Sequence, residues 1–444
     1  MKKTRKGRSA IALLLIAAAL ITCTAGCSGQ QKKVSDVTAK TSATSKAESS
    51  QPGEAESSVW KPSAVSDDSS EPAPQSSAEP SELSKAESSQ DSPFTVPEEF
   101  RDNGIYSEYY DDAYRYMTAM TLEEKVGQMI FAGLPAEDRV DIAREYHLGG
   151  YVMFGNDFAG KTKDEVISMI SSLVISQKIP LSIAVDEEGG TVTRISGKKE
   201  LSSHEFMSPR ELYKNGKMAY IQSDADEKSA LLKELGIDIN LAPVCDIATD
   251  KKDFMYDRSL GEDAKTTAEF ARIVTEISRN NGVSVTLKHF PGYGGNVDTH
   301  TGTAVDKREL KEFEEKDLIP FKAGIDAGAD FVMVSHNIVN CMDDKKPASL
   351  SENVHKYLRE KLGFTGLIIT DDLSMAAITK YAGTETPAVA AVLAGNDVII
   401  VSSAMAESSY TSLLEAVKSG KIKQKDIDRS VMRILARKYY MGLM

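Results

Sequence analysis

The sequence predicts an α/β protein that folds as a single (β/α)8 barrel of the TIM type. From about residue 105 onward, short apolar runs rich in β-branched residues alternate with segments of helical periodicity. Eight such alternations fit into residues 105–444, and strands that alternate with helices pair in parallel. Polar residues follow most of the eight runs, where barrel strands carry functional side chains.

Each element of the barrel is predicted from its own pattern. Thr121 and Glu124 form a capping box that opens a short helix. The predicted strands are 126–132, 150–154, 181–185, 237–242, 283–288, 331–335, 367–370 and 398–401. The predicted helices are 137–147, 163–177, 221–236, 263–281, 308–327, 351–362, 386–394, 408–419 and 424–440. A doubly wound open sheet would alternate similarly, but no Gly-x-Gly-x-x-Gly motif follows the first strand, which favours the barrel.

Composition and charge narrow the class of protein. A hydrophobic content of 41% is typical of a chain with a folded core. The formal net charge of −13 disfavours a nucleic-acid partner. As a separate expectation, the protein is a monomer. Four cysteines are too few for a disulfide framework, so Cys245 and Cys341 are expected to be ordinary reduced thiols.

The first residues predict an export signal. Five basic residues precede an apolar run at 11–21 that is too short to span a bilayer comfortably. The run ends in Thr24-Ala25-Gly26-Cys27, which resembles the lipobox of bacterial lipoproteins, in which the cysteine becomes the lipidated N-terminus. We therefore predict a signal peptide at 1–26 and an exported protein held by lipidated Cys27 at the extracytoplasmic face of the cell membrane. A plain secretory signal that is cut nearby is the alternative.

Residues 27–104 predict a disordered tether. This segment is rich in Ser, Ala, Glu, Lys and Pro, and the heptad Ser-Lys-Ala-Glu-Ser-Ser-Gln occurs at 45–51 and again at 84–90. Because it has almost no large apolar residues, burial cannot offset the conformational entropy that folding would cost. We interpret it as a spacer that lifts a catalytic barrel, residues 105–444, off the membrane.

Some kinds of active site are excluded by their missing motifs. There is no His-Glu-x-x-His and no paired cysteine spacing, so no metal site is expected. There is no Gly-x-Ser-x-Gly elbow and no Walker-type phosphate loop, so neither a serine hydrolase nor a cofactor is expected. What remains is a ring of acids, amines and imidazoles, which suits a small substrate with many hydroxyl groups.

Glycoside cleavage is the chemistry that this ring can perform. It needs a carboxylate on one side of the anomeric carbon and a proton donor on the other. Asp371 ends an apolar strand that can aim it, and neighbouring Asp372 should point to the opposite side. His300 can serve as acid and then as base, and Asp298 can orient its ring. From these residues alone, a loop-capping pair and a helix N-cap remain open as purely structural roles.

Four longer stretches carry a resemblance to a known family. They are Lys288-His289-Phe290-Pro291-Gly292 with Asp298-Thr299-His300, Asp186-Glu187-Glu188-Gly189-Gly190, Asp257-Arg258-Ser259-Leu260-Gly261 and Thr370-Asp371-Asp372-Leu373-Ser374-Met375. Together they resemble the signature of the β-N-acetylglucosaminidases of glycoside hydrolase family 3. The resemblance runs from about residue 121 onward, and it implies a (β/α)8-type barrel and a retaining double-displacement mechanism.

The resemblance also implies a role for each matching residue. Asp371 matches the nucleophile that forms the glycosyl-enzyme. His300 matches the acid/base on a mobile loop, and Asp298 matches its partner. The residues that match sugar contacts are Lys288, His289, Asp186, Arg194 and Arg258.

Three departures from the family pattern bear on specificity. Tyr293 stands where the family usually has a second His, and Thr191 stands where an Arg is common. The stretch 294–298 is one residue shorter than in common members. The preferred sugar or leaving group therefore stays open.

We expect an exo-glycosidase that removes non-reducing terminal β-N-acetylglucosamine from cell-wall or chitin-derived saccharides. One alternative is a family relative of the β-glucosidase or β-xylosidase type. Another is a non-catalytic sugar-binding lipoprotein, against which intact Asp371 and His300 speak. Whether water or phosphate accepts the glycosyl group is also open.

Overall fold

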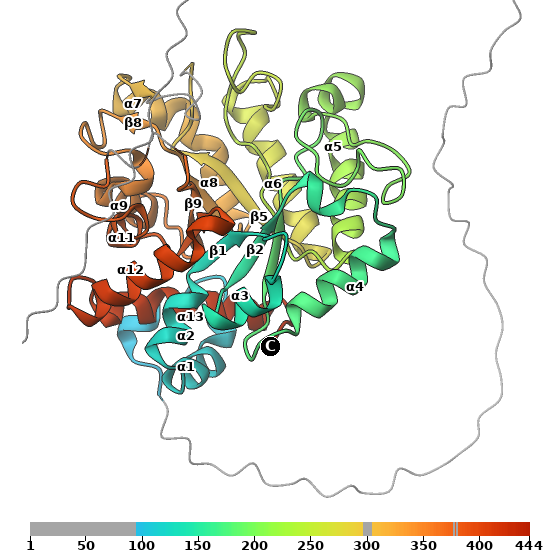
Figure 1. Ribbon diagram of the computed structural model, residues 1–444. Helices are drawn as coiled ribbons and strands as arrows, with labels where there is room; N and C mark the ends of the chain where they lie inside the picture. Colours follow the sequence, from blue (N-terminus) through green and yellow to red (C-terminus); the bar gives the residue numbers. More distant parts are fainter. Residues whose placement is uncertain (1–94, 296–303, 376–377, 379–380) are drawn as a thin grey trace, which may run out of the picture. The chain divides into compact units, whose positions relative to one another are not determined.

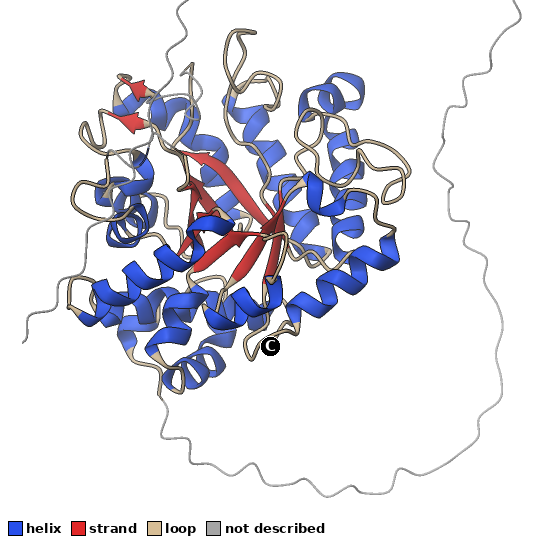
Figure 2. Cartoon of the chain, in the orientation of Figure 1, coloured by secondary structure: helices blue, strands red, loops and turns tan. Residues whose placement is uncertain are grey.

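The computed structural model describes residues 95–295, 304–375, 378 and 381–444 of the chain. Its centre is a closed barrel of parallel strands in the order β1-β10-β9-β7-β5-β4-β3-β2 (Figures 1 and 2). The predicted fold class is confirmed, and each predicted strand overlaps one barrel strand. The barrel strands are β1 (Ile130–Gly133), β2 (Gly150–Met153), β3 (Ser182–Val185), β4 (Ile239–Asn240), β5 (Ser284–Phe290), β7 (Phe331–Val334), β9 (Leu367–Asp372) and β10 (Val398–Val401).

Helices surround the strands on the outside of the barrel (Figure 2). They are α1 (Tyr110–Thr118), α2 (Leu122–Gln128), α3 (Arg139–Glu145), α4 (Lys163–Val174), α5 (Pro209–Glu234), α6 (Ala264–Asn280), α7 (Leu310–Glu312), α8 (Leu318–Asp326), α9 (Glu352–Glu360), α11 (Pro387–Ala394), α12 (Ala406–Lys418) and α13 (Gln424–Tyr440). The predicted capping box is present, since Thr121 Oγ1 accepts from Glu124 N and the Glu124 side chain accepts from Thr121 N.

The structure corrects three details of the predicted elements. Residues 126–128 belong to α2, so the first strand begins later than predicted. A second sheet, β6 (Val305–Asp306) with β8 (Ile338–Val339), was not predicted. The ordered barrel unit begins before the predicted boundary at residue 105, because Val96 is buried in the core and 3-10 turns precede α1.

Helix α13 closes the barrel at the end where the strands begin. It packs against α1 and α2, which lie beside it at the bottom of the view (Figure 1). Arg437 Nη1 donates to Ser182 Oγ at the start of β3 (2.8 Å), and Arg437 Nε donates to Ser284 Oγ at the start of β5 (3.1 Å). Arg437 also pairs with Asp238 over 2.7 Å. With this floor filled by protein, a ligand can approach only the other end, where the strands finish.

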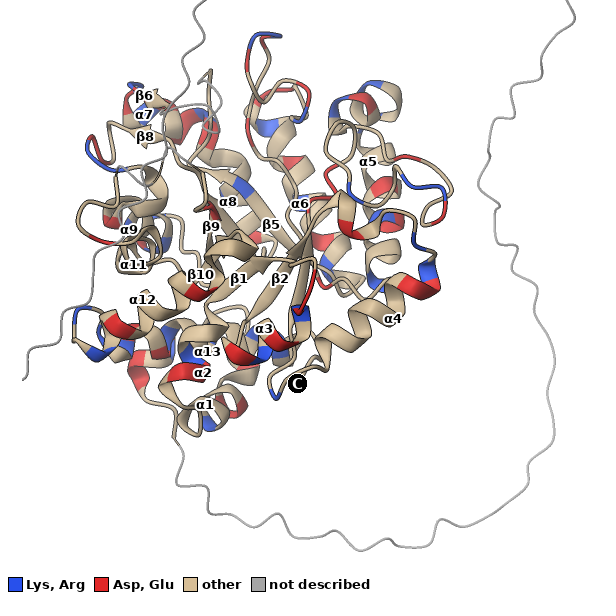
Figure 3. Ribbon diagram, in the orientation of Figure 1, with Lys and Arg blue, Asp and Glu red and all other residues tan. Residues whose placement is uncertain are grey.

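The surface of the barrel is mixed in charge. Lys and Arg are interspersed with Asp and Glu over the helices and loops (Figure 3). None of the helices within the described ranges is long and apolar enough to cross a membrane. Predictions about Cys27 and the signal peptide concern residues outside those ranges.

Candidate active site

A cleft of 290 Å³ opens at the carboxyl ends of the barrel strands. Its lining residues are Val152, Phe154, Asp186, Val192, Arg194, Leu241, Arg258, Lys288, His289, Met333, Asp371, Asp372 and Ile400. Six of the predicted site residues are therefore brought together in one cleft, from segments far apart in the sequence. The other predicted site residues, Asp298, His300 and Cys27, lie outside the described residues.

The segment after β3 places Asp186 and Arg194 side by side. Asp186 follows the last residue of the strand, and Arg194 Nη2 lies 3.4 Å from Asp186 Oδ2. The carboxylate of buried Glu187 accepts three backbone N–H groups, those of Arg194, Ile195 and Ser196, at 2.7, 2.9 and 3.1 Å. Glu187 thus fixes the loop that carries Arg194 to the cleft.

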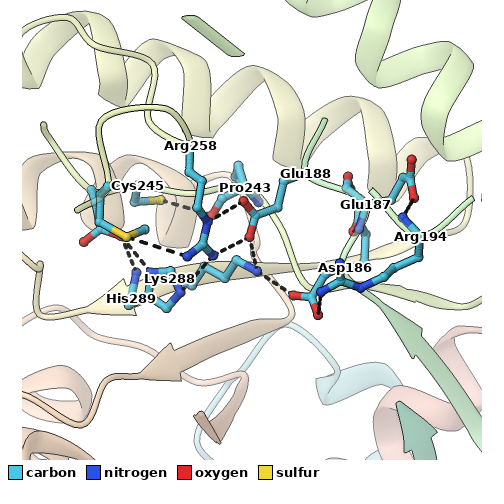
Figure 4. Close-up of polar contacts among 12 residues, drawn as sticks. Asp186, Glu187, Glu188, Arg194, Pro243, Cys245, Arg258, Lys288 and His289 are labelled. Carbon is cyan, nitrogen blue, oxygen red and sulfur yellow. Dashed lines mark hydrogen bonds and ion pairs between the residues drawn. The ribbon is translucent and has the colours of Figure 1, made fainter. Parts of the chain in front are cut away.

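Glu188 joins the two cations on the same side of the cleft (Figure 4). Its Oε1 lies 2.6 Å from both Lys288 Nζ and Arg258 Nη2, and its Oε2 accepts from Arg258 Nε at 2.9 Å. Lys288 Nζ also reaches Asp186 Oδ1 at 2.7 Å. Burial alone would raise the pKa of the Glu188 carboxyl, but Lys288 and Arg258 lower this pKa well below its usual range. The acid stays ionised and holds both cations in place.

His289 is oriented by an acid from the next element. Its Nδ1 lies 2.8 Å from Asp246 Oδ2, and the same carboxylate accepts the backbone N–H groups of His289 and Tyr293. His289 Nε2 lies 3.4 Å from Arg258 Nη2, which can only donate. Asp246 thus fixes the orientation of the imidazole, with Nδ1 toward the carboxylate and Nε2 toward Arg258. Buried Tyr293 packs its ring edge-on against the imidazole, at 5.4 Å between centroids.

Asp371 lies across the barrel from Asp186, because β9 and β3 are four places apart in the eight-strand ring. Burial raises the pKa of the Asp371 carboxyl, but His336, His289, the Asp372 N–H and Lys288 outweigh it, so this pKa lies below its ordinary value. Asp371 is therefore ionised at neutral pH, as a nucleophile or a stabilising charge must be.

Both neighbouring acids, Asp371 and Asp372, contribute to the lining of the cleft, whereas the sequence predicted that only one of the two side chains faces it. The pairing of β9 with β10 shifts register between Val398 and Ile400, and such an irregularity breaks the strict alternation of side chains. Asp372 differs in its contacts, since its Oδ1 accepts from Ser374 N at 2.8 Å.

Four residues in or beside this site had no assigned role in the sequence analysis: Glu187, Glu188, Asp246 and Phe154. The rule that polar residues follow barrel strands draws attention to Glu188 and Asp246, but it does not say that they hold other side chains. Phe154 is apolar, so the rule about polar residues did not mark it. Its position directly after β2 was the feature that could have marked it as a cleft residue. Among the described residues, no group of three or more His, Cys, Asp or Glu side chains is placed to hold a metal ion.

Comparison with known sequences finds one matching family. The profile described as "Glycosyl hydrolase family 3 N terminal domain" matches residues 121–436. Beta-hexosaminidase LpqI of Mycobacterium tuberculosis is 31% identical over 325 residues, which cover 71% of this chain and 82% of that protein. Beta-hexosaminidase of Xanthomonas campestris pv. campestris (strain B100) is 33% identical over 273 residues, which cover 60% of this chain and 81% of that protein.

Solved structures agree in fold. A glycoside hydrolase family 3 beta-N-acetylglucosaminidase from Paenibacillus sp. str. FPU-7 superposes with a TM-score of 0.68 at 33% identity. The match covers 73% of this chain and 63% of that one, so this chain spans less than two thirds of the Paenibacillus protein. The structure of M. tuberculosis LpqI superposes with a TM-score of 0.67 at 28% identity, over 73% of this chain and 96% of that one.

Proposed function

The chain belongs to glycosyl hydrolase family 3 and is a glycoside hydrolase of the β-N-acetylhexosaminidase type. From this premise, we propose that it removes non-reducing terminal β-N-acetylglucosamine by a retaining mechanism. The first step forms a bond between an Asp371 carboxylate oxygen and the anomeric carbon, while the leaving oxygen takes a proton. In the second step, water gives a proton to the residue that acted as the acid, its oxygen attacks the anomeric carbon, and the Asp371 carboxylate leaves.

One observation carries the proposal. Asp371, Asp186, Lys288 and Arg258 line a single cleft, with Asp371 across the barrel from Asp186. Buried Glu188 pairs with both Lys288 and Arg258 and so fixes these two cations. Charge-assisted hydrogen bonds from such fixed groups can hold sugar hydroxyls while an ionised carboxylate attacks. At 290 Å³ the cleft lies near the lower end of the usual range for ligand sites, about 300–1,000 Å³, which supports binding of one terminal sugar.

The proton donor in this proposal is His300, with Asp298 as its partner. Both lie outside the described residues, so the assignment rests on the sequence motif.

The test is a panel of aryl glycosides. We expect turnover of nitrophenyl β-N-acetylglucosaminide and little turnover of the glucoside and xyloside. His300→Ala should lower kcat/KM strongly for substrates with poor leaving groups and much less for the dinitrophenyl substrate. Proton donation matters most when the leaving group is basic. Turnover of the glucoside alone would favour a β-glucosidase, and binding of N-acetylglucosamine without turnover would favour a sugar-binding protein.

The place of action is part of the proposal. We propose that Cys27 is lipidated and that residues 27–94 tether the barrel to the outer face of the membrane, where cell-wall or chitin-derived saccharides are the substrates. The support is the basic and apolar start of the sequence, the lipobox-like Thr24-Ala25-Gly26-Cys27 and the low-complexity segment behind it.

A further inference from the structure

We propose that Phe154 is the floor of a separate subsite for the leaving group, on which the apolar face of a second pyranose ring stacks. The inference rests on the proposed function, because it names the binding site of the sugar that leaves when the glycosidic bond is cleaved. It adds a sugar-binding residue that the sequence motifs do not include.

Phe154 differs in exposure from the other large apolar residues that line the cleft. Its side chain is 42% exposed, whereas the apolar residues at the base of the cleft are almost fully covered. Those residues, with their exposed fractions, are Val152 (2%), Leu241 (2%), Met333 (4%) and Ile400 (4%). Phe154 therefore lies at the rim of the cleft. There, the rest of the saccharide must extend out of a pocket that holds only the terminal sugar ring.

The ring of Phe154 is held in place from several sides. Its backbone N–H donates to Asp157 Oδ2 at 2.7 Å, and its carbonyl accepts from Asp157 N at 2.9 Å. The ring lies beside the end of β1, since a Cβ on Gly133 would sit 3.6 Å from Phe154 Cε2. The Arg194 guanidinium is 5.8 Å from the ring centroid. A platform that is already fixed loses little entropy when a ligand settles on it.

The chemistry of the platform suits a pyranose. A sugar ring presents axial C–H groups on one face, and the negative face of an aromatic ring attracts such weakly positive hydrogens. The Arg194 guanidinium lies over the same ring, 5.8 Å from its centroid, and its N–H groups can donate to hydroxyl or carboxylate oxygens of the second sugar.

The test compares two substrates that differ only in the leaving group. N,N′-diacetylchitobiose releases a sugar, which needs the subsite, and N-acetyl-β-glucosaminyl fluoride releases fluoride, which does not. The full-length chain carries Phe154→Ala, the conservative Phe154→Trp, or the matched control Tyr220→Ala. Tyr220 is 50% exposed on α5 and does not line the cleft.

We expect Phe154→Ala to lower kcat/KM for the disaccharide by about tenfold, mainly through KM, with the fluoride changed by less than about twofold. Phe154→Trp should keep the disaccharide activity, and Tyr220→Ala should change neither substrate. Equal losses on both substrates, or no loss on the disaccharide, would overturn the subsite while leaving the proposed function intact. If the unaltered chain cleaves neither substrate, the proposed function itself fails and the subsite falls with it.

Discussion

The side chains around the cleft divide into those that can touch a sugar and those that hold them. Glu187 and Glu188 are adjacent in sequence and equally buried, yet the first binds three backbone N–H groups and the second binds two cations. Asp246 fixes an imidazole, and Asp371 faces the cleft with a depressed pKa. The same functional group thus serves different ends because its neighbours differ.

The nucleophile assignment is tested with a neighbouring pair of substitutions. Asp371→Asn removes the charge that attacks the anomeric carbon, and we expect kcat to fall by at least about 10³-fold. Asp372→Asn is the matched control, since it makes the same change one residue away and keeps an Oδ1 acceptor for Ser374 N. Kinetics with a nitrophenyl β-N-acetylglucosaminide measure both variants. Similar losses in the two would mean that the roles were assigned to the wrong acid.

Glu188 is predicted to act as a positioning residue. Glu188→Gln keeps the shape but removes the charge between Lys288 and Arg258, so both cations should lose their fixed placement. We expect kcat/KM to fall by about 10- to 100-fold while the protein stays folded. The control is Glu276→Gln on α6, which breaks an exposed ion pair with Arg272. An unchanged kcat/KM with a lowered melting temperature would show a structural role only.

At the scale of elements, α13 carries its cations inward. Lys438 is 1% exposed, and its Nζ donates to Gln128 Oε1, Gly149 O and Pro180 O at 2.6, 3.1 and 2.7 Å. The three donors of an ammonium group match these three acceptors. The helix is therefore fastened to the start of the barrel strands by polar contacts as well as by its apolar face.

Lys438 predicts a dependence of stability on pH. Burial lowers its pKa from 10.5 to about 7, so between these values the unfolded chain holds a proton that the folded protein releases. The free energy of unfolding of the unaltered protein should therefore rise with pH from 7 toward 10, relative to that of Lys438→Met. Urea unfolding of both proteins across this range measures the difference. Parallel curves would contradict the depressed pKa.

Most elements could be predicted because their signals are local. The exceptions have physical reasons. Residues 126–128 directly precede the apolar run of β1, but the cap at Thr121 starts a helix that runs through them. Helix α1 has charged residues on its outer face and buries Tyr110, Ala113 and Met117 against the barrel, which its composition alone did not reveal. The pair β6 and β8 forms between segments that are distant in sequence, so no local pattern marks it.

At the scale of the whole molecule, we propose that the segment before residue 95 is a passive tether. Within the described part, the hydrophobic core begins at Val96. A chain shortened to begin at Thr95 should therefore keep the kcat/KM and melting temperature of the full chain. Full-length protein should fractionate with membranes, and Cys27→Ala should release it. A shortened chain that loses activity would contradict a passive tether.

The candidate site was predictable residue by residue but not as a network. Motifs pointed to Asp186, Arg258 and Lys288 separately: Asp186 and Lys288 stand at strand ends, and Arg258 lies in the loop between β4 and α6. The contacts that join them span 70 residues from Glu188 to Arg258 and 102 residues from Asp186 to Lys288. Such pairings depend on how the barrel closes, and a one-dimensional pattern does not contain them.

The filled floor of the barrel has a consequence for the time at which the protein can fold during its synthesis. Arg437 stands after all eight barrel strands in the sequence, yet it supplies the partner for buried groups at the start of β3 and β5. Until that helix has been synthesised, Ser182 and Asp238 lack this cation, and burying them would cost free energy. We therefore expect a chain that is still being synthesised to leave its barrel unclosed until α13 has emerged. For the export proposed above, late closure of the barrel would keep the chain unfolded for its passage across the membrane.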